Sequence, residues 1–297
     1  MTQTFGSNLA RGDLTSAIGA LRDSSSPDVF VPTLGHKDCL ERLSANLTPG
    51  TVSIVTGDTG LGKTLLGSVL RQQLNFPHLT ISMPPDARIH TDVQLLRHLL
   101  ERMDVPPQGR SGLDLLSEVQ AVLDRRSASE GRMVLIIDDA HRLSSSQLDV
   151  LRTLLDVAFR GETLVVILFG EPELSERLHR KRRLDQFVAV RHVLNPVNQL
   201  DAERILDTRL HCINHRAHEL FNAAALKSLY QFSTGNPAKL LTIARTAIDS
   251  AWQSRSGDRI IPVDHRAIRD AASISTGGDG QPQLLTSLDA STRWEGR

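Results

Sequence analysis

Aromatic residues are scarce in this chain, and long apolar runs are missing. Phe, Trp and Tyr together make up 4% of its 297 residues, which argues against stacking platforms for single-stranded nucleic acid. The longest apolar runs are Val134–Ile137 and Leu164–Phe169, far shorter than the roughly 20 residues that span a bilayer. Residues 1–28 carry no apolar run behind a basic start, so we expect no secretory signal, no membrane insertion and a cytoplasmic protein.

Net charge is also lacking, because 34 basic residues balance 34 acidic ones. Bulk electrostatics therefore give no argument for binding to DNA or to a membrane surface, and only a local patch would do so. The two cysteines, Cys39 and Cys212, stand outside any metal-ligand spacing. We expect both to be reduced thiols.

Strand and helix patterns alternate through the first two thirds of the chain. Short β-branched or aliphatic runs predict five strands: 51–56, 79–83, 133–137, 164–169 and 188–194. Amphipathic segments separate them, and this alternation predicts an αβα sandwich around a five-stranded parallel sheet. Ligands of such sheets bind at the carboxyl ends of the strands.

After Pro196 the pattern changes to helical periodicity alone, which predicts a small all-helical lid domain. Four parts are therefore expected: a flexible leader over 1–28, an α/β domain over 29–196, the helical domain over 197–274, and a tail over 275–297. The tail is rich in Gly, Ser, Asp, Gln and Thr, a composition typical of disorder.

The first predicted strand runs into a glycine-rich turn that opens a helix. Its residues are Gly57, Asp58, Thr59, Gly60, Leu61, Gly62, Lys63, Thr64 and Leu65. This is the G-x-x-x-x-G-K-T motif in the strand–turn–helix context that a P-loop requires. The backbone N–H groups of such a turn cradle the phosphates of ATP. Lys63 is expected on the β- and γ-phosphates, and the Thr64 hydroxyl on Mg²⁺.

A pair of carboxylates follows the third predicted strand. Asp138 is expected to hold Mg²⁺, directly or through water, and Asp139 to polarise the attacking water as general base. Asp139 is one C–C bond, about 1.5 Å, shorter than the glutamate more usual in such a site. Slow hydrolysis is therefore an open alternative. His141 follows the pair and is a candidate sensor of the nucleotide state.

Two further residues have a functional and a structural interpretation. Glu171 follows the fourth strand, where a polar side chain could contact the γ-phosphate or the lytic water. The same turn also reads as a helix start, with Pro172 at its first position. Lys239 opens a helix of the lid, either as a cation for the nucleotide or as part of an ordinary capped helix start.

A basic run, His179 to Arg183, comes shortly after the fourth strand. Three interpretations stay open: a solvated face, a contact with DNA phosphates, or an arginine finger for the ATP of a neighbouring subunit. Arg182 and Arg183 are the preferred finger candidates, with Arg191 behind them.

These motifs together resemble the ExeA/GspA-type AAA+ ATPases, relatives of the TnsC and TniB transposition ATPases. The resemblance runs from about Phe30 to Ala272. It rests on the P-loop and on four further stretches: 135–143, 151–154, 170–174 and 232–237.

The resemblance implies ATP at subunit interfaces and assembly into rings or filaments. This chain departs from the usual family pattern at Asp139, where Glu is usual, at Glu171, where Gln is usual, and at Ala238-Lys239, where an arginine usually follows the lid proline.

Three roles are compatible with these features. The preferred one is an ATP-dependent oligomer that binds duplex DNA and acts with a transposase or other protein partner. The second is a cytosolic ATPase that helps to assemble a secretion or pilus machine. The third is a nucleotide-gated binding module that scarcely hydrolyses ATP.

Overall fold

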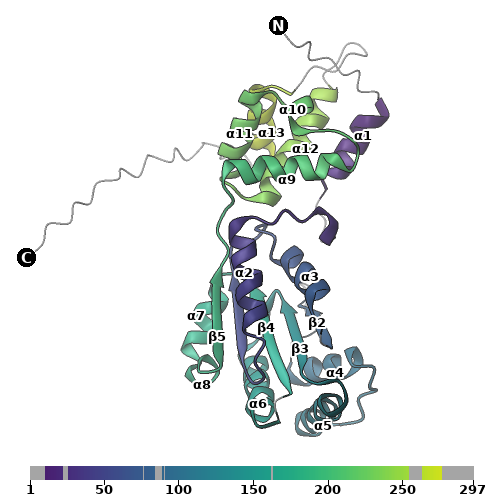
Figure 1. The fold of residues 1–297 in the computed structure, drawn as a ribbon, viewed down its shortest axis with the longest axis vertical. Helices are drawn as coiled ribbons and strands as arrows, with labels where there is room; N and C mark the ends of the chain where they lie inside the picture. The colour runs from purple at the N-terminus through teal and green to yellow at the C-terminus, as the bar shows by residue number, and fades with distance from the viewer. Residues whose placement is uncertain are drawn as a thin grey trace, which may run out of the picture.

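The computed structural model describes residues 11–22, 26–75, 77–83, 89, 91–161, 163–253 and 263–275. A five-stranded sheet lies at the centre of its α/β part (Figure 1), in the order β2-β3-β4-β1-β5 and with every pair parallel. The strands are β1 (Val52–Thr56), β2 (His78–Ser82), β3 (Met133–Asp138), β4 (Leu164–Gly170) and β5 (Val188–Val193). The predicted sheet is confirmed.

Helices cover both faces of this sheet because both faces are apolar. Successive side chains of a strand point to opposite faces. In β3, Met133, Leu135 and Ile137 accordingly pack in one buried cluster, and Val134 and Ile136 pack in another. The first cluster is covered by α4 (Asp92–Arg102), α5 (Gly112–Glu130), α6 (Ser145–Gly161), α7 (Glu173–Arg180) and α8 (Arg182–Asp185). The second is covered by α2 (Leu34–Ala45) and α3 (Lys63–Gln73).

A third buried cluster contains no residue of the five-stranded sheet. It gathers α9 (Gln199–His211), α10 (Ala217–Leu220), α11 (Ala223–Ser233), α12 (Pro237–Gln253) and α13 (His265–Ser275). Figure 1 shows these helices stacked beyond the end of the sheet at which β5 leads into α9. Leu194 packs with the sheet and Val197 with the helices. The predicted domain boundary between residues 196 and 197 stays a proposal, and this change of cluster supports it.

The N-terminal segment differs from the predicted flexible leader. Residues 11–20 form a helix, α1 (Arg11–Ala20), and Pro27–Val29 form a short 3-10 helix, η1. Ala17 and Leu21 are four residues apart, on one face of a helical turn, and both are fully buried against the helical cluster. Residues 11–21 therefore pack against α9 and α12, although their polar composition did not predict a helix.

The tail predicted to be disordered lies outside the described residues, apart from Ser275 at the end of α13. Within the described part, no helix combines the length and the apolar character needed to cross a membrane.

Candidate nucleotide site

The glycine-rich turn adopts a conformation that its glycines permit. Gly60 and Gly62 have φ of +88° and +87°, in the left-handed region that glycine enters at little cost. Gly62 caps α3, so the loop from β1 delivers its N–H groups to the N-terminus of that helix. A helix N-terminus with free N–H groups favours a bound anion. The structure thus places the predicted P-loop between a strand and a helix.

Lys63 points back into the loop. Its Nζ donates hydrogen bonds to the carbonyls of Gly57 at 2.7 Å and Asp58 at 2.9 Å. Burial lowers the pKa of the Lys63 ammonium, and the carboxylates of Glu171, Asp138, Asp139 and Asp58 oppose that shift. The Lys63 ammonium group therefore lies inside the loop in which the phosphates are expected to bind.

Thr64 and Asp138 are joined across the site. The Thr64 hydroxyl donates to Asp138 Oδ2 at 2.7 Å. Asp138 is 8% exposed, and burial raises the pKa of its carboxyl, opposed by the hydrogen bond from Thr64. Its Oδ1 accepts from the backbone N–H of Asp139 at 3.0 Å. The two predicted Mg²⁺ ligands are thus brought together.

The turn after β4 faces the P-loop directly. Glu171 Oε1 accepts a hydrogen bond from the Thr59 hydroxyl at 2.7 Å and lies 3.7 Å from His141 Nε2. The bond from Thr59 holds the pKa of the Glu171 carboxyl below its usual range. Strand order explains the meeting, since β4 lies between β3 and β1 and Thr56 pairs with Gly170.

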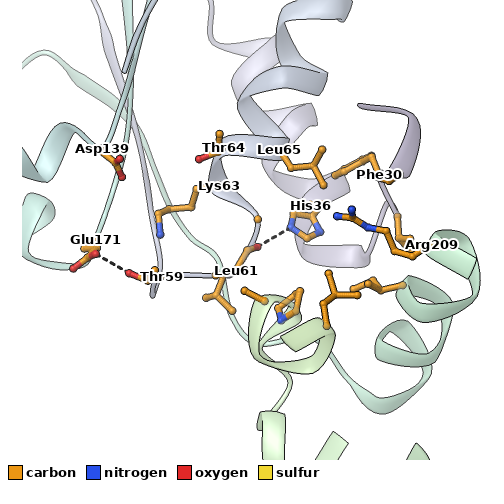
Figure 2. A pocket seen from close by; sticks show the side chains of 18 of the residues that line it. Phe30, His36, Thr59, Leu61, Lys63, Thr64, Leu65, Asp139, Glu171 and Arg209 are labelled. Atoms are coloured by element: carbon orange, nitrogen blue, oxygen red, sulfur yellow. Dashed lines mark hydrogen bonds between the residues drawn. The ribbon is translucent and has the colours of Figure 1, made fainter. Parts of the chain in front are cut away.

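Thr59, Lys63, Thr64, Asp139 and Glu171 line one cavity of about 520 Å³. Figure 2 shows the Lys63 amino group on the side of the cavity where Asp139 and Glu171 lie. The lining residues are Val29, Phe30, Val31, His36, Thr59, Gly60, Leu61, Gly62, Lys63, Thr64, Leu65, Asp139, Arg142, Glu171, Ile205, Arg209, Pro237, Ala238 and Leu241. One end carries Lys63 and the carboxylates, and the other is mainly apolar but also contains His36 and Arg209 (Figure 2).

At the apolar end, His36 ties α2 to the P-loop. Its Nε2 lies 3.3 Å from the Leu61 carbonyl and its Nδ1 2.8 Å from the Thr33 hydroxyl. Burial lowers the pKa of His36. A neutral ring with its proton on Nε2 satisfies both contacts. The Phe30 ring meets it edge-on at 5.5 Å.

The helical lid contacts the P-loop backbone through the start of α12. Asn236 Nδ2 donates to the Thr59 carbonyl at 2.8 Å, and the Ala238 N–H donates to the Gly60 carbonyl at 3.2 Å. A Cβ on Gly60 would lie 2.6 Å from Asn236 Oδ1 and 2.7 Å from Ala238 Cβ. Gly60 is therefore required for this close approach.

Lys239 is a predicted nucleotide contact that the structure does not bring to the cavity. Its side chain is exposed and does not line the cavity. Successive residues of a helix lie roughly 100° apart around its axis, and here Ala238 and Leu241 face the cavity. Lys239 lies in the first turn of α12, and its N–H donates a hydrogen bond to Asn236 Oδ1.

The basic run is divided by its ion pairs. Arg180 contacts Glu176 at 3.5 Å, and Lys181 contacts Asp149 at 2.7 Å. Arg191, the reserve candidate, is held by Asp185 and Ser175. Arg182 and Arg183 are exposed on α8, and neither lines the cavity of its own chain. Among the described residues, no ion pair involves either guanidinium.

Sequence reasoning missed several residues of the apolar end. Arg209 is 5% exposed, lines the cavity from α9 and donates to the Arg22 carbonyl at 3.1 Å. His36 looked like one more scattered histidine. Neither belongs to a local motif, because tertiary packing brings α2 and α9 to the loop.

Comparisons with known proteins agree with this geometry. Residues 47–178 match the sequence family described as an AAA domain. Curated protein sequences give no significant match. Three solved structures resemble the chain: Orc1 of Aeropyrum pernix in complex with DNA (18% identity, TM-score 0.61, covering 86% of this chain and 71% of that one), Cdc6 of Pyrobaculum aerophilum (16%, 0.61, 85% and 69%), and the RuvB Holliday junction branch migration motor of Thermotoga maritima (17%, 0.52, 86% and 73%).

These similarities show the fold. The chain has the α/β P-loop fold of AAA+ ATPases, as the sequence predicted. The ExeA or TnsC branch of that superfamily is not confirmed and stays a prediction from the motifs.

Proposed function

We propose that this protein binds and hydrolyses ATP with Mg²⁺, and that bound ATP drives its assembly into an oligomer that acts on duplex DNA. One observation carries the nucleotide part. Lys63, Thr64, Asp139 and Glu171 arise from three separate strand ends, and they line a single cavity behind which Asp138 is buried. A chain that did not bind a phosphorylated ligand would have little reason to bring an ammonium and three carboxylates together.

Each part of the nucleotide would have its own place in this cavity. The N–H groups of the P-loop and the Lys63 ammonium hold the phosphates. The adenine base lies at the apolar end, where the cavity is lined by Phe30, Val31, Ile205 and Leu241. Because α12 is bonded to the P-loop backbone, a change in the phosphates is transmitted to the lid.

The donor set fits Mg²⁺. Thr64 Oγ1 and Asp138 Oδ2 lie 2.7 Å apart beside the phosphate cradle, and oxygen ligands of this kind are those that Mg²⁺ takes alongside substrate phosphates. Thr64 and Asp138 would hold the ion, which supplies charge neutralisation for the β- and γ-phosphates. In the structure, the Thr64 hydroxyl donates a hydrogen bond to the Asp138 carboxylate.

Assembly is inferred from Arg182 and Arg183. Neighbouring cations of the basic run are held by carboxylates, whereas these two side chains are exposed and lie outside their own cavity. A second copy of the chain would supply the ATP that they contact, as an arginine finger in trans. Bound ATP would then contact two neighbouring subunits and hold them together.

DNA is proposed as the substrate on similarity and motif grounds. The structural neighbours include an Orc1 protein solved with DNA and a branch migration motor, and the motifs resemble those of the transposition ATPases. A transposase or another DNA-bound protein would be the partner in that case. The zero net charge of the chain means that a local basic surface must supply the phosphate contacts.

Sizing the full chain by light scattering tests this proposal. We expect a larger species with a non-hydrolysable ATP analogue than with ADP, and a further shift when duplex DNA is added at about 50 mM salt, reversed at higher salt. A monomer under every nucleotide condition would contradict assembly. An ATP-dependent oligomer that ignores duplex DNA at that salt concentration would contradict the DNA part alone.

A further inference from the structure

We propose that Glu171 is the carboxylate that accepts the proton of the attacking water, and that His141 is the residue that positions it. This inference rests on the proposed ATP hydrolysis. The sequence assigned the proton to Asp139 and gave Glu171 a contact with the γ-phosphate or the water. The geometry of the two turns favours Glu171 for the proton.

Both turns open at the same edge of the sheet. Strands β3 and β4 are parallel neighbours, with Ile137 paired to Leu168, so Asp139 and Glu171 follow adjacent strand ends. Glu171 and Asp139 line the same cavity as Lys63, on the side where the Lys63 amino group lies (Figure 2). Glu171 is therefore well placed beside the phosphate that Lys63 is expected to hold.

The two oxygens of Glu171 are in different situations. Oε1 accepts from Thr59 and faces His141. Oε2 has no hydrogen-bond partner among the described residues. The Glu171 side chain is 37% exposed, so water can reach Oε2 and a proton can leave from it. An anchored carboxylate with one free oxygen has the form of a general base.

His141 faces Glu171 from a buried position. Its side chain is 12% exposed, its Nε2 lies 3.7 Å from Glu171 Oε1, and its buried Nδ1 has no partner in the described part of the chain. A proton on Nε2 directs an N–H toward Glu171.

The turn that carries His141 is itself held in place. Arg177 of α7 donates to the carbonyls of His141 and Leu143 in and beside η2 (Ala140–Arg142). At the end of β4, a Cβ on Gly170 would lie 3.1 Å from the backbone nitrogen of His141. The glycine thus lets the two turns approach, and the arginine fixes them there. Pre-organisation of this kind is what a positioned base requires.

Asp139 is less well suited to accept the proton, because no hydrogen bond in the described structure holds its side chain and that side chain is short. Its backbone is left-handed with φ of +52°. It is about 1.5 Å shorter than a glutamate at the same position, and a misplacement of ~1 Å can cost on the order of 100-fold in rate. Glu171, on the neighbouring turn, has the longer side chain that this position requires.

The water oxygen forms a bond to the γ-phosphorus, and the bond from that phosphorus to the bridging oxygen of ADP breaks. The electron pair of the broken bond stays on ADP, beside Lys63. The proton of the water passes to Glu171 Oε2 and is later released to solvent, which leaves inorganic phosphate as the second product.

A carboxylate beside the triphosphate has a second consequence. Two negative charges close together repel, so Glu171 weakens ATP binding while it assists hydrolysis. Glu171→Gln removes that charge and keeps the hydrogen-bond geometry. The variant should bind ATP at least as tightly as the unmodified protein, and it should turn over about 10²–10⁴-fold more slowly.

The test measures ATP affinity with a fluorescent analogue and turnover by phosphate release, on the full chain. Glu171→Gln is compared with Asp139→Asn, for which we expect a turnover loss at least about ten times smaller. His141→Gln, which keeps an N–H donor, should retain more turnover than His141→Ala, with the loss in kcat and not in KM. Glu171→Asp serves as a second variant if Glu171→Gln fails to unfold cooperatively on heating.

Other outcomes separate the inference from the function on which it rests. Turnover abolished by Asp139→Asn and kept by Glu171→Gln would overturn the role of Glu171 and leave ATP hydrolysis standing. Weaker ATP binding by Glu171→Gln with unchanged kcat would make Glu171 a ligand of the nucleotide only. A protein that binds ATP and releases no phosphate would overturn both proposals.

Discussion

Replacing Arg182 and Arg183 together with alanine should lower ATP turnover by about 10³–10⁵-fold, the range over which an arginine finger acts. Both side chains are exposed on α8 and absent from the cavity of their own chain, so ATP affinity of the isolated chain should hardly change. The loss arises because the charge that builds up on the transferred phosphoryl group is no longer neutralised by the neighbour. Phosphate release at concentrations above and below assembly measures it.

Arg180→Ala is the matched control, since Arg180 is a neighbour in sequence that pairs with Glu176. It should cost little, as exposed ion pairs contribute about 0–1 kcal/mol. A mixing experiment then separates a finger in trans from a local effect. Lys63→Ala protein has intact arginines, so adding it to the double variant should restore part of the turnover. Absence of any recovery, with mixed oligomers demonstrated, would argue against the finger.

Asp138→Ala should abolish the dependence of ATP affinity on Mg²⁺ and lower turnover by about 10²–10³-fold. That factor corresponds to the several kcal/mol that a bound metal supplies to a transition state. Asp138 is the buried partner of Thr64, so its loss removes a carboxylate from the Mg²⁺ site and leaves the Thr64 hydroxyl without its acceptor. Titrations of ATP with Mg²⁺ and with a chelator present give the two affinities.

Asp138→Asn provides the control for structure, because its amide oxygen can still accept from Thr64 while its charge is gone. If both variants unfold at similar temperatures and both lose the Mg²⁺ dependence, the ion is held by the charge of Asp138. An affinity that still rises with Mg²⁺ in Asp138→Ala would place the metal elsewhere.

The parts of the site that are local in sequence were predictable. The P-loop was predictable because its motif, which includes Gly60, Gly62, Lys63 and Thr64, lies within the eight consecutive residues 57–64. The strands announced themselves because a sheet covered on both faces needs continuous apolar runs. Asp138 followed from its position at the tip of such a run.

Other parts depend on packing between distant segments. The rotation of α12 that presents Ala238 and turns Lys239 outward is set where that helix meets Gly60. Helix α1 owes its order to α9 and α12, which lie far along the chain. Arg209 and His36 enter the cavity for the same reason. No short sequence pattern encodes such contacts. The ion pairs that hold the neighbouring cations, and so distinguish Arg182 and Arg183 from them, cannot be predicted from the sequence either.

The most direct test of the nucleotide site compares ATP binding by Lys63→Ala and Lys239→Ala with binding by the unmodified protein, using calorimetric titration with Mg²⁺. Lys63 is buried in the P-loop and Lys239 is exposed on the lid. Charge-assisted hydrogen bonds contribute about 1.5–3 kcal/mol each, so Lys63→Ala should weaken ATP binding by about 10²–10³-fold, and Lys239→Ala should leave it unchanged. Equal affinity for all three proteins would contradict the account.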